Sequence, residues 1–149
     1  TLMFKYLPSF FKTSYDGGPN SGVSGFWLIE WKMVFSLVFL KFNKGTREAY
    51  HNHAFSALTF WIWGGPVTEH HIDGTKIDWY PSLFPKYTPK TCFHKIEAHN
   101  DTYAFCIRGP WDETWKEYRE IDDLFIKFGH GREIIEMEPL LDVEDKKHC

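Results

Sequence analysis

The sequence has little of three features that define common protein classes. It contains three cysteines in 149 residues, without the spacing of a disulfide framework, which predicts reduced thiols and a cytoplasmic location. No basic run occurs and the formal net charge is −3, so nucleic acid is not an expected partner. The longest apolar run, Met33 to Leu40, is too short to cross a bilayer, so no membrane partner is expected either.

Hydrophobic residues are abundant instead. They make up 43% of the chain, and aromatic residues alone make up 19%, so a chain of this length can bury one substantial core. We expect a single domain over residues 1–149, with its core from about 31 to 118, an irregular N-terminal segment and a charged C-terminal tail.

Short segments rich in β-branched and aromatic residues recur along the chain, separated by turn signals. Residues 1–15 look irregular, the glycine-rich stretch Tyr15 to Gly25 is interpreted as a surface loop, and only Trp111 to Phe128 could hold a helical turn or two. This pattern predicts an all-β fold, an antiparallel sandwich or barrel. The expected strands are 31–42, 47–53, 54–63, 66–72, 75–79, 90–97 and 101–108.

Two histidines stand one residue apart in the segment YHNHAFSALTFWIWGG, Tyr50 to Gly65. Side chains alternate faces along a strand, so His51 and His53 are predicted to share a face. Two neutral imidazoles on one face suit Fe(II), Zn(II), Ni(II) or Mn(II). The alternative is that both are solvated at the end of a strand. The same face would continue through Phe55, Ala57, Thr59 and Trp61.

A third histidine, His94, opens a predicted hairpin in the segment TCFHKIEAHNDTYAFCIRGPW, Thr91 to Trp111. Together with His51 and His53 it would form a facial metal site with open coordination positions, which suits catalysis better than a closed structural site. Cys92 precedes His94 by two residues and would face the same side, either as a fourth ligand or as core packing.

These two segments resemble the two motifs of the cupin superfamily. YHNHAFSALTFWIWGG is similar to the first motif, in which HxH precedes a strand and a glycine turn. FHKIEAHNDTYAFCIRGPW is similar to the second motif of the cysteine-dioxygenase branch. The pattern as a whole resembles small, mostly uncharacterised cupins found often in phage and environmental genomes, over about Val34 to Tyr118. The resemblance implies a single-domain cupin barrel, that is, a double-stranded β-helix or jelly roll.

The resemblance also implies an activity. Most cupins place a glutamate ligand four or five positions after the second histidine, where this chain has Ala57 and Leu58. The set of His51, His53 and His94 is instead similar to the three-histidine iron site of thiol dioxygenases. It implies a non-haem Fe(II) dioxygenase acting on a small thiol or anionic substrate, with Zn, Ni or Mn as other metals such a site can hold.

Two further residues are candidate catalytic groups. On the strand after Asp101, the alternation predicts that Ala104, Cys106 and Arg108 point inward. Cys106 and Arg108 match positions where cysteine dioxygenase carries a histidine and a catalytic tyrosine. Because the tyrosine is missing here, the resemblance argues against cysteine itself as the substrate.

Arginine is costly to bury alone, so an inward Arg108 requires an anion. The anion is either a carboxylate of this chain in a structural ion pair, or the carboxylate or phosphate of a ligand. The candidate structural partners of Arg108 are Glu97, Glu48 and Asp101.

Two further histidines, His70 and His71, are expected on the surface of an outer strand.

Other functions stay open at this point. The barrel could bind or sequester a small-molecule ligand without catalysis, act as a metal-dependent isomerase or lyase, or have lost its metal. Whether the protein is an enzyme or a binding protein, its expected partner is a small molecule. Because cupins often pair through their sheet edges, a homodimer is also expected.

Overall fold

All regular structure in the described part of this computed structural model is β-strand, as the sequence predicts. The structure describes residues 7–16, 21–45, 50–112, 117–121, 124–128 and 134–139. Among these residues there is no helix that could span a membrane. The cytoplasmic location stays a prediction.

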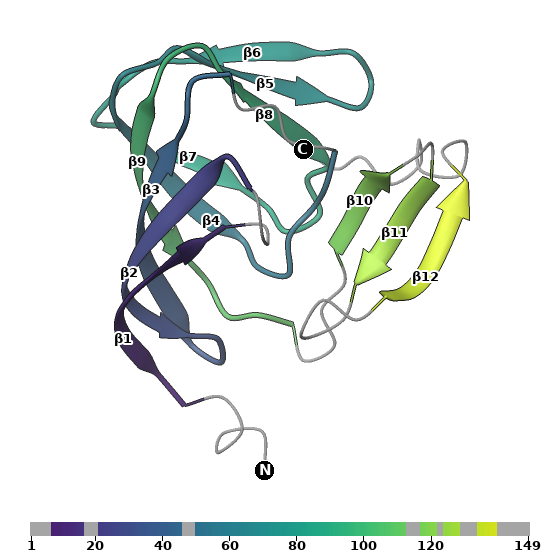
Figure 1. The fold of residues 1–149 in the computed structure, drawn as a ribbon, viewed down its shortest axis with the longest axis horizontal. Helices are drawn as coiled ribbons and strands as arrows, with labels where there is room; N and C mark the ends of the chain where they lie inside the picture. The colour runs from purple at the N-terminus through teal and green to yellow at the C-terminus, as the bar shows by residue number, and fades with distance from the viewer. Residues whose placement is uncertain are drawn as a thin grey trace.

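Two antiparallel sheets face each other and enclose the core (Figure 1). The main sheet has six strands in the order β1-β2-β3-β9-β4-β7, and the smaller sheet has three in the order β6-β5-β8. The strands of the main sheet are β1 (Ser9–Tyr15), β2 (Val23–Trp31), β3 (Phe35–Phe42), β9 (Thr102–Arg108), β4 (Ala57–Trp63) and β7 (Lys86–Thr88). The strands of the smaller sheet are β6 (Lys76–Trp79), β5 (Val67–His71) and β8 (His94–Ala98).

The core forms because inward and outward positions alternate along each strand. On β3, Val38 and Leu40 are buried while Phe39 between them is exposed. The inward side chains of both sheets meet in one cluster. Its largest members include Trp27, Val38, Leu40, Phe42, Phe55, Trp61, Val67 and Ile96.

The glycine pair that ends the HxH segment carries the chain from one sheet to the other. Gly64 follows β4 with a φ of +83°, a conformation that favours glycine. A Cβ atom at this position would lie 2.1 Å from the carbonyl oxygen of Asp101. The turn between β4 and β5 therefore requires glycine both for its backbone conformation and for the close approach of the β8–β9 turn.

Four sequence predictions about strand boundaries are wrong. The stretch Tyr15 to Gly25 is not all surface loop, since Tyr15 ends β1 and β2 begins at the buried Val23. The predicted strand 31–42 is a hairpin: β2 ends at Trp31, and Val34 N donates to Trp31 O (2.8 Å) before β3 begins. Residues 9–15 are not irregular but form the edge strand β1, paired with β2. Residues 50–53 contain an isolated bridge at His51 rather than a strand, and residues 46–49 lie outside the described residues.

A third, three-stranded sheet lies beside the barrel in Figure 1. It consists of β10 (Glu117–Ile121), β11 (Leu124–Phe128) and β12 (Ile134–Pro139). The helical turn predicted within 111–128 does not occur among the described residues, since β10 and β11 occupy most of that stretch. The single domain over the whole chain stays a prediction.

Candidate metal centre

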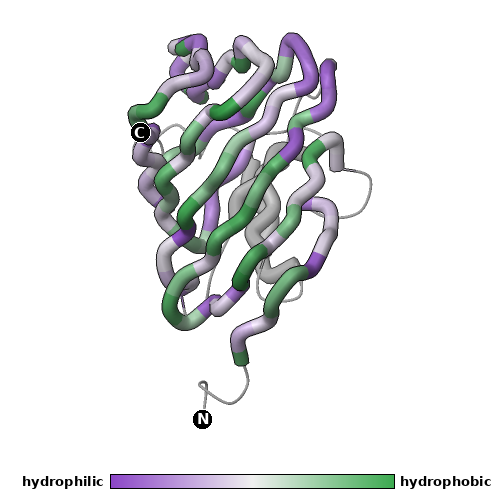
Figure 2. The backbone as a smooth tube through the Cα atoms, turned by 90° about the vertical axis from the view of Figure 1, so that its left-hand side faces the viewer, coloured by the Kyte–Doolittle hydropathy of each residue, from purple (hydrophilic) through white to green (hydrophobic). Residues whose placement is uncertain are grey.

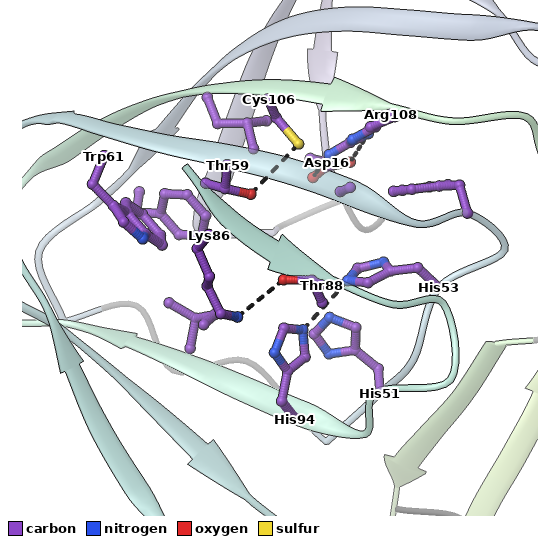
Figure 3. A pocket seen from close by; sticks show the side chains of 15 residues that line it. Asp16, His51, His53, Thr59, Trp61, Lys86, Thr88, His94, Cys106 and Arg108 are labelled. Atoms are coloured by element: carbon purple, nitrogen blue, oxygen red, sulfur yellow. Dashed lines mark hydrogen bonds and ion pairs between the residues drawn. The ribbon is translucent and has the colours of Figure 1, made fainter. Parts of the chain in front are cut away.

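The three predicted histidines come together in one place, as Figure 3 shows. One nitrogen atom of each imidazole of His51, His53 and His94 lies within 4.8 Å of the others. The ring centroids of His51 and His53 are 4.7 Å apart, and that of His94 lies 5.2 Å from His51 and 5.6 Å from His53. His51 and His94 are buried, and His53 is half-buried.

The backbone explains why these residues converge although they are distant in sequence. His51 and His94 exchange two hydrogen bonds, His51 N to His94 O (2.9 Å) and His94 N to His51 O (3.0 Å). This bridge attaches the loop before β4 to the first residue of β8. His53 reaches the same point from that loop rather than from a strand. The prediction that the two histidines share a face therefore holds, but its premise of a regular strand does not.

The histidines stand at one end of an internal cavity of the barrel. The residues predicted to continue their face also line it, which confirms the alternation through the start of β4. Polar groups reach the cavity from β7 and β9 (Figure 3). The lining residues used below are Phe55, Thr59, Trp61, Lys86, Thr88, Cys106 and Arg108.

Glu69, on β5, orients His94 by contacting the ring nitrogen that does not face His53. Its side chain is 1% exposed, and its Oε2 lies 2.5 Å from Nδ1 of His94. A carboxylate accepts hydrogen bonds, so Nδ1 carries the proton and donates a hydrogen bond to Glu69. The other ring nitrogen, Nε2, is then unprotonated, and it faces the Nε2 of His53 at 3.5 Å. This is the tautomer and orientation of a histidine that binds a metal.

Lys86 balances the charge of Glu69. Its Nζ donates to the same Oε2 and to Oγ1 of Thr88 (3.0 Å), and its side chain is 10% exposed. Burial raises the pKa of Glu69, but the hydrogen bond from His94 and the charge and hydrogen bond of Lys86 together lower it well below its usual range. Glu69 is therefore ionised at neutral pH, and Lys86 is its counter-charge.

His94 is neutral at neutral pH. Burial lowers the pKa of His94 most, the hydrogen bond to Glu69 partly offsets this, and the pKa is lowered overall to about 4. A neutral imidazole is the form that binds metals. The donor chemistry of the site therefore fits a metal ion, which His51, His53 and His94 would hold.

Arg108 points inward as predicted, but its partner is Asp16. Its two terminal nitrogens donate to the two carboxylate oxygens of Asp16 at 2.7 and 3.3 Å. Burial lowers the pKa of Arg108, and the charge and hydrogen bonds of Asp16 raise it above its ordinary value. The expected partners Glu97 and Asp101 are wrong, because Glu97 pairs with His70 (3.0 Å) and Asp101 accepts from Lys44 N (2.7 Å). Glu48 lies outside the described residues.

The other cysteines and histidines depart from prediction in part. Cys106 is a buried free thiol, 3.7 Å from Oγ1 of Thr59, and its inward orientation is confirmed. Cys92 is disulfide-bonded, so it is neither a reduced thiol nor a fourth metal ligand. His70 is buried rather than on the surface, and His71 is only half-buried, with its Nε2 3.1 Å from Oε1 of Glu69.

Comparison with known proteins identifies the fold. No protein-family model and no curated protein matches the sequence. Among solved structures, an RmlC-like cupin from Shewanella frigidimarina NCIMB 400 matches with a TM-score of 0.54 and 17% identity, over 69% of this chain and 86% of that one. KdgF from Halomonas sp. matches with a TM-score of 0.53 and 19% identity, over 70% and 97%. The fold is a cupin jelly roll.

A salicylate 1,2-dioxygenase from Pseudoaminobacter salicylatoxidans, a structure of its adducts with gentisate, also matches this chain. The TM-score is 0.51 with 13% identity, over 64% of this chain and 26% of that one. At these identities the likeness shows the fold alone.

Sequence reasoning missed the buried groups that support the three histidines. The cupin motif points to a glutamate only at the positions of Ala57 and Leu58, so it gives no indication of Glu69. A usable signal was present: Glu69 alternates with Val67 on β5, so an acid occupies an inward position of a short strand. Asp16 carried no such signal, because it stands in a stretch interpreted as a surface loop.

Proposed function

We propose that this protein is a mononuclear metal-binding cupin that acts as a three-histidine non-haem Fe(II) dioxygenase on a small thiol or other anionic substrate. The observation that carries the proposal is the convergence of His51, His53 and His94, with the Nε2 of His94 turned toward the others by Glu69. Fe(II) held by these three imidazoles would supply the redox chemistry that a dioxygenase requires.

The ligand set supports an open site rather than a closed one. Among the described residues that line the cavity, Asp16 is the one carboxylate, and Arg108 holds it through two hydrogen bonds. Glu69 contacts the far nitrogen of His94 and is engaged by Lys86. Three protein ligands with no further carboxylate at the centre are typical of catalytic sites.

The charges of the cavity support an anionic substrate. Asp16 balances Arg108 and Glu69 balances Lys86, so both built-in pairs are neutral overall. Neutral imidazoles add no charge, which leaves the two positive charges of Fe(II) to be balanced in a low-dielectric cavity. A thiolate or carboxylate balances them, and its binding is correspondingly favoured over that of a neutral molecule.

The shape of the cavity supports a small substrate. Its volume is about 70 Å³, and its walls include Phe55 and Trp61. These aromatic rings exclude water from the reacting end of the substrate. At the polar side, Lys86 with Thr88 and Arg108 with Cys106 offer donors that can orient an anionic group.

The comparisons support the reaction class only by analogy, since a salicylate 1,2-dioxygenase shares the cupin fold. The closer relation to the cysteine-dioxygenase branch is part of the proposal, and it has its basis in the sequence motifs.

The test begins with metal analysis of protein purified without a histidine tag. The protein is then prepared anaerobically, reconstituted with Fe(II), and assayed for O2 uptake with a panel of small thiols and carboxylates. We expect about one iron per chain and substrate-dependent O2 uptake. Replacement of His51, His53 or His94 by alanine should abolish both. The matched control is His99→Ala, which removes an imidazole that contacts Thr68 rather than the site.

The outcomes separate the alternatives. Bound iron without O2 uptake for any substrate would argue against the dioxygenase and leave a metal-binding cupin. Protein that binds no metal but retains a small anion would favour the non-catalytic binder. Zinc that resists chelation would favour a structural or hydrolytic site.

A further inference from the structure

The outer face of the main sheet is apolar, although it lies on the side opposite the core. Sheets of this kind usually alternate apolar inward and polar outward positions. Here the outward positions of β2, β3, β9 and β4 carry mainly aromatic and aliphatic side chains. Figure 2 looks onto this sheet, and no described strand lies in front of it.

A row of four phenylalanines crosses this face. Phe26 on β2 is in register with Phe39 on β3, Phe39 with Phe105 on β9, and Phe105 with Phe60 on β4. The ring centroids of Phe39 and Phe105 are 4.9 Å apart, and those of Phe60 and Phe105 are 6.4 Å apart. Phe26 is 38% exposed and Phe39 44%, so the row is a surface feature.

A second row beside it is aliphatic. Leu37 on β3, Ile107 on β9 and Leu58 on β4 are in register with one another. The nearest outward charge on the strands is Lys41, which pairs with Tyr103 at the margin. We call the two rows together the aromatic face. Because it carries no charge of its own, two copies of it do not repel each other.

The aromatic face also has a groove with a protrusion beside it. Phe39, Phe60 and Phe105 line the groove together with Leu83 from the β6–β7 loop. Leu83 is 92% exposed, and the loop is attached to β4 by the hydrogen bond from Ser82 N to Trp61 O (3.0 Å). A protruding leucine next to an apolar groove is self-complementary, which is the requirement of a twofold interface.

The exposed area is large enough for a stable dimer. A fully exposed large apolar side chain presents roughly 200 Å². With the exposed fractions of its members, the aromatic face and its border present on the order of 800 Å², which is the area that each partner of a stable interface buries. The members with the largest exposed fractions are Leu83, Phe84, Ile62, Phe39, Tyr103 and Phe26.

We propose that a second copy of this chain covers the aromatic face, so that the protein is a homodimer formed by packing main sheet against main sheet. Leu83 of each copy enters the groove of the other. The interface uses the face of the sheet, not its edges, and leaves the histidine cavity on the inner side of the sheet untouched.

Sedimentation equilibrium over the micromolar range tests the proposal. Phe39→Lys places a charge at the centre of the aromatic face, and Leu83→Asp places one on the protruding loop. Each should weaken dimerisation at least about tenfold, because a charge at the centre of an interface is desolvated. Leu83 is 92% exposed, so its variant tests the proposal even where Phe39→Lys does not fold. The matched control is Ile77→Asp on β6, which should stay dimeric.

Three results would overturn the proposal. One is a wild-type protein that is monomeric throughout the range. Another is a dimer that both face variants leave intact, which would locate the interface elsewhere, for example at the sheet edges. The third is a monomer that binds lipid vesicles through this face, which would make a membrane surface the occupant.

Discussion

Replacing Glu69 by methionine tests how this protein holds its third histidine. Met has a similar length and no charge, so Glu69→Met removes the carboxylate that His94 and Lys86 share. Two effects follow from one substitution. Lys86 loses its counter-charge in a buried setting, and Nδ1 of His94 loses its acceptor.

The first effect is a loss of stability. The side chains of Glu69 and Lys86 are 1% and 10% exposed, so water does little to screen the pair. Removing one member of such a pair costs about 3 to 5 kcal/mol in the free energy of unfolding. Removing both members costs little, because two apolar side chains of similar volume replace two desolvated charges. The variant Glu69→Met with Lys86→Met should therefore recover most of the lost stability.

The second effect is a loss of metal affinity. Without Glu69, the proton of His94 can move to Nε2, the nitrogen that would face the metal. Loss of such a carboxylate weakens metal binding by about 10- to 100-fold, which corresponds to about 1.4 to 2.8 kcal/mol. The double variant has no carboxylate either, so its metal affinity should stay as low as that of Glu69→Met.

Two assays separate the effects. Urea unfolding of the metal-free proteins gives stability, and competition with a chelator gives the dissociation constant for Fe(II) or Zn(II). The reasoning requires the double variant to regain stability without regaining metal affinity. Wild-type affinity in the double variant would refute the role of Glu69 in orienting His94. Wild-type stability in Glu69→Met would refute the buried ion pair.

Two further predictions concern the frame around the site. Asp16→Asn should lower the free energy of unfolding by about 2 kcal/mol, because Arg108 stays buried without its counter-charge; urea unfolding checks this, and added acetate should restore part of the loss. Gly64→Ala should cost at least about twice as much as Gly45→Ala. Both glycines have positive φ, but a Cβ at Gly64 meets the carbonyl of Asp101, whereas one at Gly45 meets nothing within 4 Å. Equal losses in thermal unfolding would contradict the steric argument.

The alternation of inward and outward residues in short segments was sufficient to predict the fold class and the inner wall of the cavity. Alternation with a period of two is a property of short segments, so it placed Cys106 and Arg108 inward. It also placed Phe55, Ala57 and Thr59 on the side of the histidines. Boundaries were less accurate, because the turn between Trp31 and Val34 interrupts an apolar stretch that carries no glycine or proline.

The chain alone specifies the strands, which side of each faces the core, and a short list of imidazoles, since all three depend on neighbours a few residues apart. The partners of those residues are a different matter. Arg108 meets Asp16 across 92 positions, and His94 meets Glu69 across 25. Asp16, just after β1, reaches Arg108 on β9 although β2 and β3 lie between these two strands in the sheet. Glu69 meets His94 because β5 pairs with β8 in a particular register. That register is set by the packing of the whole barrel, and no segment encodes it locally.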